Sequence, residues 1–146
     1  MRNAFEDENE AFETSRPFSS PCFAAAVLDC SKYSLSDYIQ SGVIPLAFDI
    51  GMPGATRLCL RVSTASVLAV RTGLKASSDM AKFFDGAFPK DRPHYRPPRL
   101  AWMLHCDYDH IYHLLAGNVL ADAGGATRYQ IPRQSILDFL AGRRLA

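Results

Sequence analysis

The chain has 146 residues, a formal net charge of +1 and 48% hydrophobic residues. This length predicts one domain or two very small ones. The near-neutral net charge excludes a strongly basic or strongly acidic protein, whose charge alone would indicate its class of partner. The sequence has no apolar run of the ~20 residues that span a membrane, and no basic start followed by a signal-like apolar run. We therefore expect a cytoplasmic protein without a membrane partner.

Residues 1–17 form an acidic segment at the start of the chain. They carry five acidic and two basic side chains, a net charge of −3, so the remaining residues carry +4. Acidic and polar composition of this kind is typical of a flexible tail. We expect folded structure to begin at about residue 18.

Residues 21–44 repeat at residues 97–120. The two stretches align without a gap at an offset of 76, with five identities in 24 positions. Five identities alone are weak support, but the apolar positions agree as well, and both stretches have a Leu-x-Cys before a polar turn, at Cys30 and Cys106. We infer a duplication in which each copy forms two short amphipathic helices.

Two alternating apolar runs follow the first helix pair, at residues 46–50 and 58–62. They flank Gly51-Met-Pro-Gly54, and a turn of this composition between alternating runs predicts a β-hairpin. Residues 62–70 then align with 131–139 at an offset of 69. We therefore expect a closing helix after the hairpin and place the first unit at residues 18–75.

Residues 76–94 are interpreted as a connector between two units. Asp79 stands near the start of a short helix predicted over residues 78–84, and the prolines that follow cannot continue it. Three phenylalanines in this connector are expected to pack the two units together: Phe83, Phe84 and Phe88.

The second unit is placed at residues 95–146. Apolar residues recur at i, i+3 and i+4 in two short segments, Leu100, Met103, Leu104 and Ile111, Leu114, Leu115. This spacing predicts two helices separated by a polar turn. Gly124-Gly125 then lies between Val119–Ala121 and Arg128–Ile131, which predicts a second hairpin. Pro132 suits the start of a closing helix.

This order resembles the winged helix-turn-helix domains of the excisionase and MerR-like families. The residues that carry the resemblance are Ile111-Tyr-His-Leu-Leu115 in the second helix and Arg128-Tyr-Gln-Ile-Pro-Arg133 at the end of the wing, and they lie in about a third of the chain. Asn118 departs from the glycine that often closes the second helix in these families, although asparagine also adopts the left-handed backbone conformation.

The resemblance implies an α+β fold of two tandem winged helix-turn-helix units that bind double-stranded DNA. The protein would be a transcriptional regulator or an excisionase-like architectural factor that sets the direction of recombination, with RNA polymerase or an integrase as its protein partner. In such folds a helix enters the major groove, and the wing contacts phosphates. Carried over residue by residue, the resemblance nominates these DNA-binding residues: Lys32, Tyr33, Ser34, Ser36, Arg57, Arg61, Arg99, Tyr108, His110, Tyr112, His113, Thr127, Arg128 and Arg133.

A second interpretation is a protein-interaction adaptor or anti-repressor that keeps the fold without binding DNA. Asp107 and Asp109 lie at the start of the helix of the second unit that is expected to enter the major groove, and their carboxylates would repel phosphate. Aspartate is, however, also a preferred N-cap residue of helices. If the arginines of both units form one continuous surface, DNA is favoured. If Asp37, Asp107 and Asp109 dominate that surface, a protein partner is favoured.

Metal and enzyme interpretations receive less support. Cys106, His110 and His113 have a spacing that would let all three face one side of a helix and bind a metal. However, Cys106 aligns with Cys30, which no histidines follow, so we prefer a thiol in the core with exposed histidines. The sequence has neither a G-x-S-x-G elbow nor a phosphate-binding glycine loop. We expect no enzymatic activity, metal or cofactor.

Overall fold

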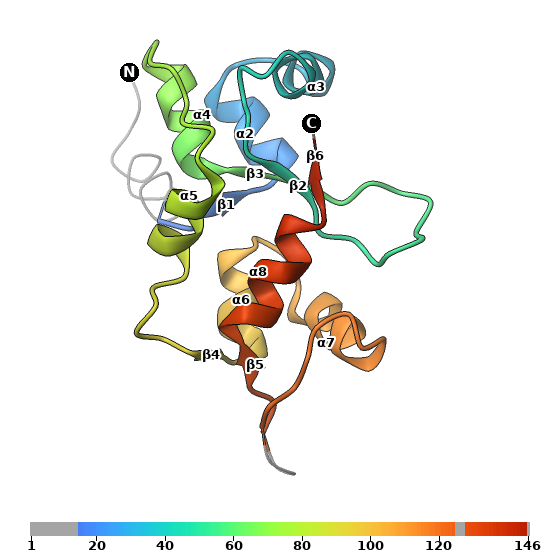
Figure 1. Cartoon of the computed structure of the whole chain (residues 1–146). Coiled ribbons are helices and arrows are strands. Elements are labelled where there is room, and N and C mark those ends of the chain that lie inside the picture. The colour runs from blue at the N-terminus through green and yellow to red at the C-terminus, as the bar shows by residue number, and fades with distance from the viewer. Residues whose placement is uncertain (1–14, 125–127, 146) are drawn as a thin grey trace, which may run out of the picture.

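The computed structural model describes residues 15–124 and 128–145, and it shows an α+β fold with small antiparallel sheets (Figure 1). Most of the acidic segment expected to be flexible, and Thr127, lie outside the described residues. In the described part, no helix is long and apolar enough to cross a membrane. The elements are β1 (Phe18–Ser19), α2 (Pro21–Val27), α3 (Lys32–Gln40), β2 (Ala47–Asp49), β3 (Leu60–Ser63), α4 (Thr64–Arg71), α5 (Met80–Ala87), β4 (His94–Tyr95), α6 (Pro97–Met103), α7 (Tyr108–Ala116), β5 (Ile131–Pro132), α8 (Arg133–Ala141) and β6 (Arg144–Leu145).

The helices of the first half begin at serine caps. The Ser20 hydroxyl accepts the backbone N–H of Phe23, and Pro21 follows it as the first helical residue. The Ser31 hydroxyl accepts the backbone N–H of Ser34 in the same way. These bonds satisfy N–H groups that a helix start otherwise leaves without a partner. The helix starts are thus encoded locally.

The pattern of elements repeats along the chain at the offsets that the sequence alignment gives. α6 and α7 begin and end 76 positions after α2 and α3, and α8 begins 69 positions after α4. The turn inside each helix pair contains a left-handed residue, Asp29 at φ 50° and His105 at φ 55°. A left-handed residue also follows each second helix, Gly42 at φ 83° and Asn118 at φ 59°. The repeat therefore extends to the conformation of single residues.

The first half forms a four-stranded antiparallel sheet in the order β1-β3-β2-β6. The predicted hairpin is present as β2 and β3, with Ala47 opposite Val62. β6 comes from the end of the chain and pairs with β2, which places Arg144 opposite Phe48. Because β6 belongs to the second half, the end of the chain completes the sheet of the first half. Neither β1 nor β6 was predicted from the sequence.

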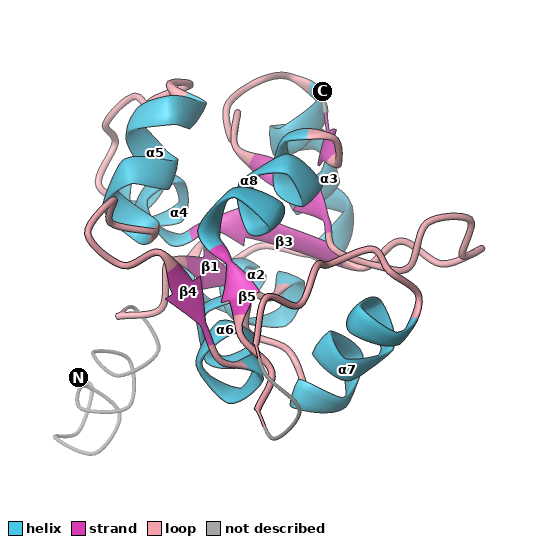
Figure 2. Cartoon of the chain, turned by 60° about the horizontal axis from the view of Figure 1, so that its bottom comes forward, coloured by secondary structure: helices cyan, strands magenta, loops and turns pink. Residues whose placement is uncertain are grey.

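The second predicted hairpin is wrong in its pairing. Residues 119–124 and 128–130 contain no strand, and β5 pairs instead with β4, with Ile131 opposite Tyr95 (Figure 2). Asp122 Oδ1 accepts the backbone N–H groups of Gly124 (2.8 Å) and Gln130 (3.0 Å). The Asp122 side chain thus takes the Gln130 N–H that a strand ladder would use, although the Ala123 N–H still donates to the Gln130 carbonyl oxygen (2.8 Å).

The same carboxylate contact occurs at the base of the first hairpin. Asp49 Oδ1 accepts the backbone N–H groups of Gly51 (2.9 Å) and Cys59 (3.0 Å). In the second half, the N–H groups of Gln130 and then Gly124 lower the pKa of Asp122 below its ordinary value, because they stabilise the ionised carboxylate. The loops 50–59 and 123–130 therefore begin from equivalent aspartates.

One hydrophobic cluster joins the two halves, and the buried residues of a second cluster, which include Leu35, Ile44 and Val62, all belong to the first half. Phe18 and Phe48 of the first half lie in the same buried cluster as Phe84, Phe88 and the inward residues of α6, α7 and α8. Ring centroids are 5.9 Å apart for Phe48 and Phe84, and 6.2 Å apart for Phe18 and Phe88. The expectation that the connector phenylalanines pack the halves together is confirmed. Each buried phenylalanine contributes about 1.5–3 kcal/mol, so we expect the halves to unfold together.

Candidate nucleic-acid interface

α7 carries an exposed aromatic cluster. Tyr108 is 58% exposed, and its ring centroid lies 6.2 Å from that of Tyr112 in an edge-to-face contact. Tyr112 lies 5.4 Å from Tyr129, which belongs to loop 123–130. The contact holds Tyr129 against the helix. Tyr129 was not predicted as a site residue, and its only signal in the sequence was its place next to Arg128.

The outward face of α7 also carries polar side chains. Ile111, Leu114 and Leu115 are buried in the shared core, which leaves the opposite side of the helix to solvent. His113 and Asp109 are exposed there, and Arg128 is exposed on loop 123–130. Aromatic faces, an imidazole and a guanidinium are groups that contact bases and phosphates.

Loop 50–59 from the first half lies against the same helix. His110 Nε2 is 2.6 Å from the Ile50 carbonyl oxygen, and a Cβ added to Gly117 would lie 2.9 Å from Met52 Cε. In Figure 1 the loop between β2 and β3 is on the same side of the molecule as α7. α7 is therefore flanked by a loop from each half, and Arg57 is exposed on the first of them.

Three of the nominated residues contact backbone carbonyl oxygens of segments that are distant in sequence. Arg61 donates from Nε to the carbonyl oxygens of Leu104 (2.9 Å) and His105 (3.1 Å), at the end of α6. Arg133 donates from Nε to Phe88 O (2.6 Å) and from Nη2 to Asp85 Oδ1 (3.1 Å). His110 contacts Ile50, as described above. The structure therefore gives these three side chains the role of joining segments that are distant in sequence.

α3 exposes a smaller set of groups. Tyr33 is 86% exposed, and Lys32 and Ser36 are exposed beside it. Ser34 is half-buried, and its hydroxyl accepts a hydrogen bond from the Ser31 hydroxyl at the helix start (3.2 Å). Lys32, Tyr33 and Ser36 are thus the nominated residues of α3 that face solvent.

Arg99 is on a different part of the surface from loop 123–130. Its guanidinium lies 5.5 Å from the ring centroid of Trp102, and its side chain lines a cavity with Arg92 and Tyr95. In Figures 1 and 2, α7 is on one side of α6, and the segment that leads into β4 is on the other. Arg99 therefore belongs to the wall of this cavity.

Three acidic side chains accompany the exposed helices. Asp37, Asp107 and Asp109 are all exposed. Asp107 occupies the residue before α7, but its side chain makes no capping hydrogen bond. Its carboxylate is therefore not needed to start the helix, and the charge stays on the surface near the aromatic cluster.

The Cys106 region does not have the properties of a metal site. Cys106 packs against the shared core, and burial raises the pKa of its thiol to about 12. The metal-free thiol therefore stays protonated at neutral pH. Among residues 15–124 and 128–145, no group of three histidine, cysteine, aspartate or glutamate side chains could hold a metal ion.

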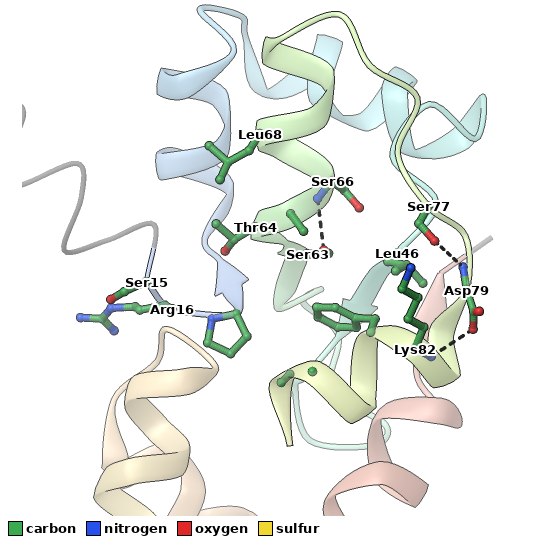
Figure 3. A pocket seen from close by; sticks show the side chains of 15 residues that line it. Ser15, Arg16, Leu46, Ser63, Thr64, Ser66, Leu68, Ser77, Asp79 and Lys82 are labelled. Carbon is green, nitrogen blue, oxygen red and sulfur yellow. Dashed lines mark hydrogen bonds between the residues drawn. The ribbon is translucent and has the colours of Figure 1, made fainter. Parts of the chain in front are cut away.

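A cavity of about 540 Å³ lies between α4, α5 and the segment before β1 (Figure 3). Its wall is mainly apolar, and the polar groups on it have partners. The Ser63 hydroxyl accepts the Ser66 N–H (3.2 Å), and Asp79 Oδ1 accepts the Lys82 N–H (3.0 Å). The Thr64 hydroxyl is 2.6 Å from that of Ser19. These groups stabilise the helix starts and the sheet, so we do not assign a site here.

The function of the surface around α7 has to be inferred from its own chemistry. Comparison with family models, with curated proteins and with solved structures finds no match to this chain.

Proposed function

We propose that the protein binds double-stranded DNA, with α7 as the helix that enters the major groove. The observation that carries the proposal is the position of α7 between loops 50–59 and 123–130, each with an exposed arginine, Arg57 and Arg128. A groove ~12 Å wide admits one helix. Basic loops on either side of that helix would contact phosphates. Tyr112 and His113 would then contact base edges.

The helix pair of the first half, α2 and α3, supports a tandem arrangement of two DNA-binding units. α3 stands in the first half where α7 stands in the second, and it exposes Lys32, Tyr33 and Ser36. Two winged helix-turn-helix units would occupy half-sites about one helical turn, ~10 bp, apart. Because both units belong to one chain, modest affinity in each gives tight binding overall.

Such a protein would act as a transcriptional regulator or as an excisionase-like architectural factor in recombination. A regulator would work beside RNA polymerase, and a recombination factor beside an integrase. Both roles would use the same DNA-binding surface. They differ in the protein that acts on the bound DNA, which is RNA polymerase for a regulator and an integrase for a recombination factor.

The exposed carboxylates favour a second candidate, a protein-interaction adaptor or anti-repressor. Asp107 and Asp109 lie at the start of α7, and Asp37 lies on α3. In addition, Arg61 and Arg133 bind within the fold and add little free positive charge. A partner protein with a basic surface would suit this arrangement.

The proposal is tested by fluorescence anisotropy with labelled DNA and the full chain, since the halves share a core. We expect binding to random duplexes that weakens steeply from ~50 mM to ~200 mM salt, and tighter binding to a selected site. Arg128→Ala should weaken binding to all duplexes and reduce the slope of log K against log salt by about 0.9. His113→Ala should change the preference among sites.

The matched control is Lys75→Ala, which removes an exposed charge outside both loops and helices. It should leave affinity and slope nearly unchanged. If wild-type protein does not bind duplex DNA at ~50 mM salt, or if Arg128→Ala and Lys75→Ala behave alike, the DNA proposal is wrong and the adaptor is favoured.

A further inference from the structure

A second cavity, also of about 540 Å³, lies beside α6. Its wall is formed by the end of α5, the segment before β4, β4 itself and α6, through Gly86, Ala87, Pro89, Asp91, Arg92, Pro93, Tyr95, Arg99 and Met103. A cavity of 300–1,000 Å³ is typical of a small-molecule site. Unlike the cavity in Figure 3, it has two guanidinium groups on its wall.

Tyr95 is the unusual polar residue of this cavity. The side chain is 2% exposed, and the hydroxyl is buried without a hydrogen-bond partner in the structure. A buried hydroxyl without a partner costs about 1–3 kcal/mol, and native proteins rarely leave such groups unpaired. Burial raises the pKa of Tyr95, so the hydroxyl keeps its proton and can donate. The group is available to a ligand oxygen.

The charges nearest the Tyr95 hydroxyl are mainly positive. After burial, the largest influences on its pKa are the guanidinium groups of Arg92, Arg133 and Arg99, and Asp91 acts more weakly in the opposite direction. Arg133 is held by Asp85 (3.1 Å), which also lies 3.9 Å from Lys90. In the described residues, neither Arg92 nor Arg99 has an ion-pair partner. Both are therefore available for an anion.

The two free arginines rest on aromatic rings. The guanidinium carbon of Arg92 is 5.6 Å from the centroid of Tyr95, and that of Arg99 is 5.5 Å from the centroid of Trp102. Cation–π contacts at exposed sites are worth only about 0.5–1 kcal/mol. An anion can therefore draw Arg92 away from the ring at small cost.

We propose that this cavity binds the phosphate group of a small phosphate ester, held by Arg92, Arg99 and the Tyr95 hydroxyl. Guanidinium groups bind phosphate through paired N–H donors, and the phenol adds one more donor. None of the residues that line the cavity belongs to α7, and the segment that leads into β4 is on the other side of α6 from α7 (Figures 1 and 2). The cavity is therefore a ligand site separate from the α7 surface, and it does not depend on DNA binding.

The binding test uses the full chain with inorganic phosphate and pyrophosphate as probes. Trp102 is the only tryptophan, and because Arg99 lies on its ring, its fluorescence should change as an anion binds. We expect a saturable change that sodium chloride of equal ionic strength does not produce, with affinity confirmed by calorimetry. Tyr95→Phe removes only the hydroxyl and should weaken binding about tenfold, the effect of losing a hydrogen bond to a charged group.

Arg92→Gln keeps a polar side chain, and it should weaken binding at least as much as Tyr95→Phe. Lys75→Gln removes an exposed positive charge outside this cavity and outside the proposed DNA surface, and it should bind the probes as wild-type does. Saturable binding that depends on Tyr95 and Arg92 supports the site. No saturable binding of either probe, or equal affinity in wild type, Tyr95→Phe and Arg92→Gln, would overturn it.

A competition with duplex DNA distinguishes the source of the phosphate. If the ligand is a free ester, Tyr95→Phe loses affinity for pyrophosphate and keeps the DNA affinity of wild type. If the cavity instead takes a backbone phosphate, the variant loses affinity for both, and pyrophosphate displaces DNA; the small-ester proposal is then wrong. Absence of DNA binding by wild type would reject the DNA proposal alone.

Discussion

Arg143 binds Asp49 across 94 positions of the chain. Its Nη2 donates to Asp49 Oδ2 (2.8 Å), and its Nε donates to the Asp49 carbonyl oxygen (3.0 Å). Both side chains are mostly buried, with 24% and 21% of their surfaces exposed. The other carboxylate oxygen of Asp49 accepts the N–H groups of Gly51 and Cys59. One aspartate therefore fixes both the base of loop 50–59 and the end of the chain.

We expect Arg143→Ala to lower the free energy of unfolding by about 2 kcal/mol, because it removes charge-assisted hydrogen bonds in a largely desolvated position. Urea unfolding followed by circular dichroism measures the change. Lys75→Ala is the matched control and should alter stability by less than about 0.5 kcal/mol. Equal stability of both variants would show that the end of the chain contributes little.

Arg61 and Arg57 should behave differently although both were nominated as phosphate contacts. Arg61→Ala removes donors to the carbonyl oxygens of Leu104 and His105 and should destabilise the fold by about 2 kcal/mol. Arg57→Ala should leave stability within about 0.5 kcal/mol and lower DNA affinity. Thermal unfolding and anisotropy on the same two variants separate these effects. A stable Arg61→Ala protein with weakened DNA binding would contradict the structural role.

Gly42 and Gly86 both have room for a Cβ but differ in backbone conformation, so substituting each by alanine tests the effect of conformation alone. A Cβ at Gly42 or at Gly86 would meet no atom within 4 Å, but Gly42 has φ 83° and Gly86 lies within α5. Gly42→Ala should destabilise the protein by about 1 kcal/mol because alanine is strained in the left-handed region. Gly86→Ala should stabilise it by about 0.5 kcal/mol. Chemical denaturation of both variants tests whether the changes have opposite signs.

The thiols of Cys106 and Cys22 should differ in reactivity. Burial holds the pKa of Cys106 at about 12, so thiolate is scarce at about pH 8, whereas Cys22 is exposed. Brief treatment with iodoacetamide, followed by peptide mass spectrometry, should label Cys22 and spare Cys106. In urea both should be labelled. Rapid labelling of Cys106 in the folded protein would show that the thiol is accessible.

The sequence by itself determined the helices and their repetition. Serine and aspartate caps, apolar spacing and the left-handed turn residues act over a few positions, so they can be read without knowledge of the fold. The helix predicted over residues 78–84 is present as α5, which begins at Met80 and ends at Ala87, with Asp79 as its cap. The offsets of 76 and 69 likewise match the positions of the helices.

Apart from the β2–β3 hairpin, which the sequence predicted, only the tertiary structure decided which strands pair and which charged side chains stay unpaired. β6 joins β2, and β5 joins β4 instead of forming a hairpin, because such pairings depend on the closure of the shared core around Phe18 and Phe48. The same closure brings Arg61 and Arg133 into contact with backbone carbonyl oxygens of segments that are distant in sequence. It also buries the Tyr95 hydroxyl without a hydrogen-bond partner in the described residues. The residue type determines which hydrogen bonds a side chain can form. Long-range packing determines whether its partner is another part of the protein or a ligand.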